Sequence, residues 1–91
     1  MNELNVQALA QQLKILANQA IAIYTQKVEA IIDNQITNHN RIELTFDAML
    51  DFCYDDEMLL LYKKLARYYF IFNPQGTVNY INYYREMYEN E

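Results

Sequence analysis

The chain contains no serine and no tryptophan, and only one glycine, one proline, one cysteine and one histidine among its 91 residues. The absence of serine excludes the nucleophile elbow of a serine hydrolase, and a single glycine cannot form a glycine-rich phosphate loop. The lone histidine, His39, has neither an acid nor a cysteine beside it in the sequence, so it lacks support as a general base. The sequence also has no zinc-ligand spacing and no calcium loop. We therefore expect a protein that is not an enzyme, with no catalytic, cofactor-binding or metal-binding residues.

Long apolar runs are also missing, and basic residues are fewer than acidic ones. No run is long enough to span a bilayer, and the N-terminus lacks the basic region of a signal peptide. The lone Cys53 cannot form an intramolecular disulfide, which suits a reducing compartment. A net charge of −5 disfavours non-specific binding to nucleic acid or anionic lipid. We expect a cytoplasmic protein without a membrane segment, folded as one helical domain over residues 1–91.

The scarcity of glycine and proline favours long helices joined by short connections. The sequence predicts an all-α fold, a compact four-helix bundle with helices at about residues 3–36, 41–54, 56–72 and 74–88. The first of these would be about 50 Å long. Its apolar residues fall on one face of a helical wheel, and the phase holds over five or more turns, which favours one unbroken helix. They are Val6, Leu9, Leu13, Leu16, Ala17, Ala20, Tyr24, Val28 and Ile31.

Capping residues mark where the shorter helices begin. Asn40 is expected to cap the second helix, because Glu43 follows at the spacing of a capping box. Asp55 is expected to cap the third helix, and Asn73 the fourth, with Pro74 at its first position. The third helix is apolar on nearly every side, which is typical of a helix buried between neighbours, so we place it at the centre.

Residues 68–84 hold seven aromatic residues, which could form either a stacking platform or part of a core. Helical spacing favours the core, because four of the rings share the inner faces of the third and fourth helices. These four are Tyr69, Phe72, Tyr80 and Tyr84. We expect them to pack against one another, while Tyr68, Phe70 and Tyr83 lie near the boundary and could face a partner.

An acidic residue recurs every four positions along the second helix and its end, at Glu43, Asp47, Asp51 and Asp55. We call this series the acidic stripe. Its spacing places it opposite the predicted core face, as a solvated surface with no structural role. Like charges four residues apart repel mildly, so such a face could instead serve a partner with a basic surface. The acidic stripe is therefore our candidate partner-binding site.

The third helix carries a basic cluster, Lys63, Lys64 and Arg67, next to Tyr68. Cations beside an aromatic ring could contact phosphates and stack a base. The cluster is small, however, in a chain with twelve acidic and seven basic residues. We keep a helical nucleic-acid-binding regulator that uses these four residues as the alternative hypothesis.

The leading hypothesis is a non-catalytic protein–protein interaction module, such as a small adaptor, inhibitor or regulatory subunit. It would act through the acidic stripe or through exposed apolar helix positions, with another protein rather than nucleic acid as its partner. Three short helices cannot cover a first helix about 50 Å long, so apolar positions should remain exposed. We expect these at Ile15 and Ala22 on the first helix and at Leu60 and Ile71 on the third. A homodimer formed by part of the first helix, or by the outer face of the third, would cover them.

Overall fold

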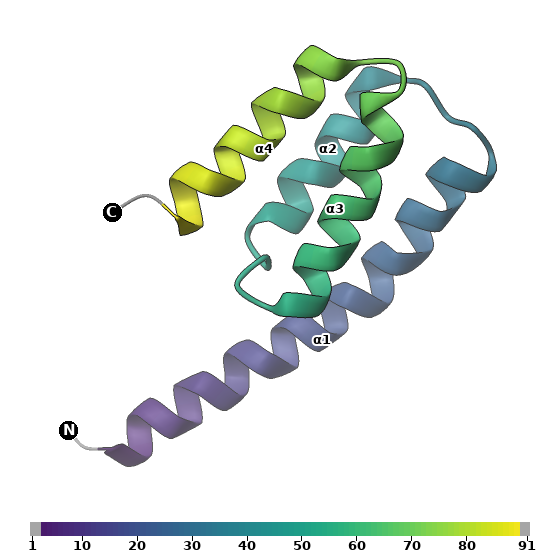
Figure 1. Cartoon of the computed structure of the whole chain (residues 1–91). Helices are drawn as coiled ribbons and strands as arrows, with labels where there is room; N and C mark the ends of the chain where they lie inside the picture. The colour runs from purple at the N-terminus through teal and green to yellow at the C-terminus, as the bar shows by residue number, and fades with distance from the viewer. Residues whose placement is uncertain (1–2, 90–91) are drawn as a thin grey trace.

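The computed structural model describes residues 3–89, with side chains from Asn5 onward. It contains four helices: α1 (Glu3–Asp33), α2 (His39–Leu50), α3 (Asp56–Phe70) and α4 (Pro74–Tyr88) (Figure 1). The predicted all-α four-helix bundle is confirmed, and the bounds of α4 match the prediction.

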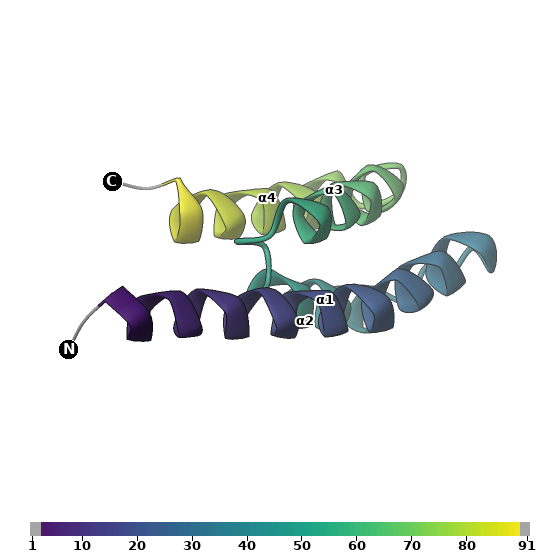
Figure 2. The ribbon, with the colours of Figure 1, turned by 90° about the horizontal axis from the view of Figure 1, so that it is seen from below.

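The helices form two layers, α1 beside α2 and α3 beside α4 (Figure 2). Among the four, α3 packs against each of the other three helices. The prediction that the third helix lies at the centre is therefore confirmed, although Leu60, Phe70 and Ile71 on its outer side stay exposed.

The first helix ends at Asp33 rather than at the predicted residue 36. Gln35 adopts a left-handed conformation with φ of 52°. The backbone N–H of Ile36 then bonds to the carbonyl of Ile31, and that of Gln35 to the carbonyl of Ile32. This pair of bonds is the Schellman motif, which usually places glycine at the left-handed position. Because glutamine stands where glycine would normally signal the end of a helix, the sequence did not predict this end.

The second helix begins earlier than predicted, and Asn38 caps it instead of Asn40. The Asn38 side chain accepts a hydrogen bond from the Arg41 backbone N–H at 2.8 Å. This start places His39 at the first helical position, where its ring packs on Tyr69 and Phe72 at centroid distances of 5.7 and 6.1 Å. This tertiary contact favours Asn38 as the cap, although Glu43 lies at the capping-box spacing from Asn40.

Two predicted helix ends lie too far along the chain. The second helix ends at Leu50 rather than at residue 54, and residues 51–54 form tight turns with bonds such as Phe52 N–H to the Met49 carbonyl. The chain must leave the helical conformation there, because the cap Asp55 is extended, with φ of −97° and ψ of 133°. The third helix ends at Phe70 instead of residue 72, where the chain tightens before α4.

The predicted caps of α3 and α4 are confirmed. The Asp55 carboxylate accepts the backbone N–H of Glu57 at 2.9 Å. The Asn73 side chain accepts the backbone N–H of Gly76 at 3.0 Å, with Pro74 in the first turn. Gly76 is buried in that turn, so the only glycine in the chain is a packing residue and does not form a loop.

The core is centred on a ring from α2, that of Phe46. Phe46 is fully buried and stacks on Tyr80 at a centroid distance of 4.8 Å. It also contacts Tyr62 and Tyr69, at 5.0 and 5.8 Å. The prediction that residues of the aromatic segment build the core is thus confirmed.

The predicted direct packing of four rings is only partly right. Tyr69 contacts Phe72 at 5.4 Å, but it reaches Tyr80 through Phe46. Tyr84 lies against Tyr62 at 6.2 Å. Phe72 and Tyr84 are only partly buried, because they lie at the edge of the core.

The N-terminal half of α1 extends beyond the other helices (Figure 1). Every residue from Asn5 to Leu16 is exposed, and burial begins at Ala17. The three shorter helices therefore leave part of the apolar face of α1 uncovered, as its length predicted, and the uncovered part is this half. None of the helices in the described part of the chain has the length and apolarity needed to cross a membrane.

Candidate functional site

Two carboxylates of the acidic stripe accept hydrogen bonds from core tyrosines. The Tyr69 hydroxyl donates to Glu43 Oε2 at 2.6 Å, and the Tyr80 hydroxyl donates to Asp47 Oδ1 at 2.8 Å. Because Glu43 and Asp47 lie one turn apart on α2, they meet one tyrosine from α3 and one from α4. These bonds join α2 to both helices of the other layer.

A third member of the stripe, Asp55, is buried at the start of α3. Its Oδ2 lies 2.7 Å from the Lys14 ammonium, which donates a hydrogen bond from α1. This hydrogen bond lowers the pKa of the Asp55 carboxyl, with a further contribution from the Glu57 backbone N–H. Of the other members of the stripe, Asp47 and Asp51 are exposed and Glu43 is half-buried.

The prediction that the acidic stripe has no structural role is therefore wrong. The helical wheel placed Glu43, Asp47 and Asp55 opposite the core, but tyrosine hydroxyls and Lys14 reach them from neighbouring helices. Tyrosine can do this because its ring is buried while its hydroxyl projects to the edge of the core. The use of the stripe as a partner-binding surface stays a prediction.

The tyrosines of this network remain protonated donors at neutral pH. Burial raises the pKa of Tyr69 to about 12, and the hydrogen bond to Glu43 acts in the same direction. Burial and then Asp47 likewise raise the pKa of Tyr80 above the usual range of tyrosine. The amide of Asn73 also donates to the Tyr69 hydroxyl at 2.7 Å, which orients that hydroxyl toward Glu43. The network is thus a structural one, with each hydroxyl held in place.

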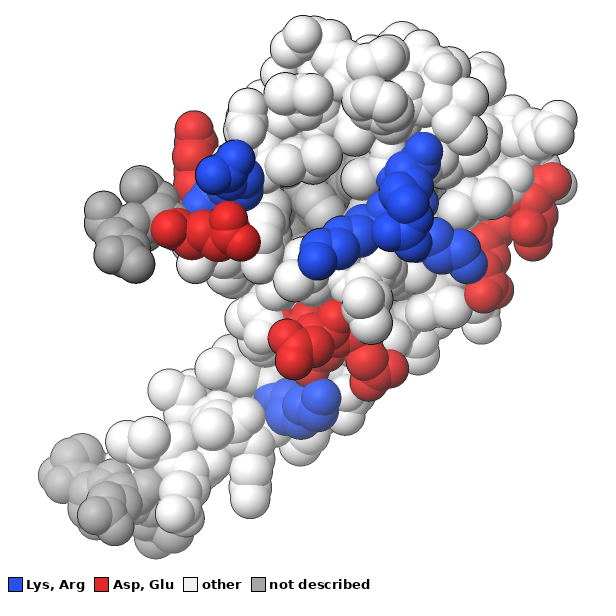
Figure 3. All heavy atoms as spheres, in the orientation of Figure 1, with Lys and Arg blue, Asp and Glu red and all other residues white. Residues whose placement is uncertain are grey.

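The three cations of the basic cluster lie exposed on α3. Figure 3 shows basic side chains gathered over α3, with a group of acidic side chains beside the turn that precedes it. Within the described residues, the ion pairs are Lys14 with Asp55 and Arg85 with Glu89, so Lys63, Lys64 and Arg67 have no ion-pair partner there. Their charge is therefore available to a ligand.

The aromatic member of the basic cluster is less available than its cations. Tyr68 is half-buried, and its hydroxyl donates to the Ile36 carbonyl at 2.6 Å. Its ring also packs edge-on against Phe72, at a centroid distance of 5.3 Å. A base would have to stack on the part of the ring that remains exposed. Nucleic-acid binding through this cluster stays a prediction.

The largest exposed apolar feature of α1 is a row on its protruding half, Val6, Leu9, Leu13 and Leu16, which we call the α1 row. These side chains are 68%, 58%, 42% and 49% exposed, respectively. The turns that carry them are anchored to the bundle near Leu13, where the Tyr54 hydroxyl donates to the Leu13 carbonyl at 2.7 Å and Lys14 meets Asp55. Ile15, Ala22, Leu60 and Ile71 are also exposed, as predicted.

The remaining residues with potential chemistry lie apart from one another. Cys53 is buried after α2, and burial raises the pKa of its thiol to about 12, so it carries no thiolate at neutral pH. His39 is exposed at the opposite end of α2, against Tyr69 and Phe72. Over residues 3–89, no three His, Cys, Asp or Glu side chains are close enough together to hold a metal ion.

Comparisons with protein-family models, curated proteins and solved structures found no match for this chain. A functional proposal is therefore based on the surfaces of the chain itself. Those surfaces are the α1 row, the unpaired cations of α3 and the exposed part of the acidic stripe.

Proposed function

We propose that this protein is a non-catalytic interaction module that pairs with a second copy through the N-terminal half of α1. The observation that carries the proposal is the α1 row, four large apolar side chains exposed on a helix that extends past its own bundle. Apolar surface gathered on one side of an element usually marks an interface. A two-fold homodimer is the commonest solution for a small chain.

The spacing of the α1 row supports helix-to-helix pairing in particular. The residues follow one another at steps of three, four and three positions. This alternation is the seam of a coiled coil, in which each apolar side chain fits between residues of the facing helix. The seam ends at Leu16, because Ala20, the next position in the series, is buried in the core of the chain's own bundle.

The energetics of an isolated helix also support the proposal. A helix of about 12–15 residues is marginal in water, and most helical stability in proteins comes from packing of an apolar face. The protruding half of α1 is about that long and is exposed from Asn5 to Leu16. Burying large apolar side chains contributes roughly 1.5–3 kcal/mol each, which a second copy would supply.

As an adaptor or regulatory subunit, the dimer would leave the exposed part of the acidic stripe and the α3 cations free for another protein. A cytoplasmic location belongs to the same proposal, since the single cysteine is reduced and buried.

Light scattering at micromolar concentration tests the pairing. We expect the wild type to have twice the 10.9 kDa mass of one chain. The double variant Val6→Glu with Leu9→Glu should have the mass of a single chain. The matched control is Gln7→Glu with Gln11→Glu, which adds the same charge on the other side of α1 and should stay dimeric. A wild-type mass near that of one chain, or a monomeric control, would overturn the pairing.

A further inference from the structure

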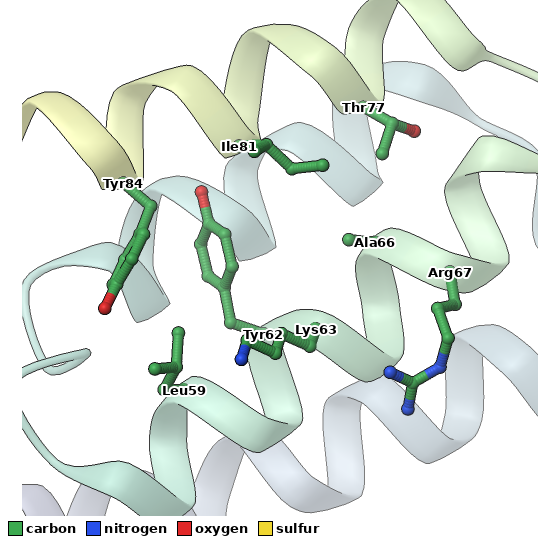
Figure 4. A pocket seen from close by; sticks show the side chains of 8 residues that line it. All are labelled: Leu59, Tyr62, Lys63, Ala66, Arg67, Thr77, Ile81 and Tyr84. Atoms are coloured by element: carbon green, nitrogen blue, oxygen red, sulfur yellow. The ribbon is translucent and has the colours of Figure 1, made fainter. Parts of the chain in front are cut away.

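A half-open groove of about 290 Å³ lies between α3 and α4, apart from the α1 row. Figure 4 shows its walls: Leu59, Tyr62 and Ala66 come from α3, while Ile81 and Tyr84 come from α4. The Tyr62 hydroxyl donates to the Tyr80 carbonyl at 2.7 Å, so its polar atom is satisfied, and its buried ring forms an apolar floor beneath the groove.

The α3 rim of this groove is positively charged. Lys63 and Arg67 both line it, one turn apart, and neither has an ion-pair partner among the described residues. Lys64, the third cation of the helix, does not line the groove. The chain as a whole has a net charge of −5. The two unpaired cations nevertheless make the charge beside this apolar groove locally positive.

The dimensions match the apolar face of a helix. From Leu59 to Ala66 the wall runs along two turns of α3, about 10 Å. Anchors one turn apart on a docked helix would meet such a wall at two or three positions. Acidic residues one turn apart on its flank would then face Lys63 and Arg67.

We propose that this groove binds an acidic amphipathic helix of a partner protein. The partner's apolar side chains would lie between Tyr62 and Ile81, and its carboxylates would pair with Lys63 and Arg67. Charge complementarity is the reason for choosing this occupant: the rim of the groove is cationic, whereas the α1 row of a second copy holds no acid between Asn5 and Leu16. The site is independent of pairing through α1 and is tested separately.

The probe is a fluorescein-labelled helical peptide of about 16 residues, with leucines at i, i+4 and i+7 and glutamates along one flank. Its controls are the same peptide with lysines for glutamates, a copy of residues 3–18 of this chain, and a single-stranded oligonucleotide. Fluorescence anisotropy should show that the acidic peptide binds most tightly, with affinity falling as salt is raised.

Charge reversal on the rim tests whether the acidic peptide binds in this groove. Lys63→Glu with Arg67→Glu should weaken binding of the acidic peptide by at least about tenfold, since an exposed ion pair is worth up to roughly fivefold and reversal adds repulsion. The matched control Lys64→Glu should change the affinity for the acidic peptide by less than about twofold. Ile81→Glu, at a position 41% exposed, should abolish binding while thermal unfolding shows that the variant is folded.

Four results would overturn the proposal. They are failure of the acidic peptide to bind, equal binding of the lysine peptide, preferred binding of the copied α1 segment, and an oligonucleotide that binds more tightly than any peptide. Equal losses in Lys64→Glu and the rim variant would also overturn it, because the attraction would then be to α3 as a whole.

Discussion

The ammonium of Lys14 lies 2.7 Å from a carboxylate oxygen of Asp55, 41 positions further along the chain. This ion pair ties α1 to the start of α3 at the point where α1 leaves the bundle. Asp55 also caps α3, so one carboxylate both fixes the start of one helix and anchors another.

The pair gives the protein an acid-sensitive component of stability. The Lys14 hydrogen bond lowers the folded-state pKa of Asp55 below 3.8, so the unfolded chain binds more protons in acid. The contribution is therefore complete above pH 3.8 and is lost as the pH falls through the lowered folded-state pKa. Urea titrations over an acidic pH series should show a flatter pH dependence for Lys14→Met than for the wild type. Equal slopes would contradict the pairing.

Phe46 should be the most sensitive aromatic position. Replacing it with alanine removes three ring contacts from a fully buried site and should cost about 3–5 kcal/mol of unfolding free energy. Phe72 lies at the edge of the core, so Phe72→Ala should cost roughly half as much. Phe70, which is 53% exposed, is the control and should change little on replacement. Urea titration of the three variants measures their losses of unfolding free energy. A loss at Phe70 as large as that at Phe46 would contradict the prediction.

Asp47 and Asp51 are neighbours in the acidic stripe, but they should respond differently to amidation. Asp47→Asn weakens the acceptor for the Tyr80 hydroxyl and should cost about 0.5–1 kcal/mol, since hydrogen bonds to charged groups are the stronger ones. Asp51 is exposed, so Asp51→Asn should leave the unfolding free energy the same or slightly higher. Thermal unfolding compares the two, and Tyr80→Phe should remove the difference between Asp47 and Asn at that position.

Gly76 should resist substitution although it lies within a helix. Alanine there would gain about 1 kcal/mol of helix propensity. Its Cβ, however, would lie 2.5 Å from Asn73 Nδ2 and 3.0 Å from a Tyr69 ring carbon. We expect a net loss of about 1–2 kcal/mol for Gly76→Ala, because the cap must shift or the ring must move. Gln75→Ala, in the same turn but exposed, is the control. A stabilised Gly76→Ala would show that the cap can move aside freely.

Local chemistry could be predicted from the sequence, whereas contacts between distant elements could not. Asp55 and Asn73 were correctly identified as caps because a cap acts within one turn of its own helix. The end of α1 was missed because Gln35 holds a position that normally takes glycine. The capping-box spacing favoured Asn40, but Asn38 caps the helix, and the ring of His39 packs there on two aromatic rings.

The contrast between local chemistry and distant contacts also explains which features of the candidate sites the sequence could predict. The wheel placed the α1 row on an apolar face but could not show that the bundle covers this face only from Ala17 onward. It also placed Glu43 opposite the core without showing that a tyrosine hydroxyl from α3 would reach it. The groove between α3 and α4 depends on how the two helices diverge, for which the sequence carries no local pattern.

The boundary at Ala17 divides α1 into two segments with different lifetimes of their backbone hydrogen bonds. Amide protons before Leu13 open by local fraying of a single helix, so in one chain they should exchange with solvent within moments. Amides from Ala17 to Ile31 lie over the core and should exchange only when the bundle itself opens. Pairing with a second copy would move the boundary between fast and slow amide exchange toward the N-terminus of α1. Assembly and the ordering of this half of α1 would then be one cooperative event.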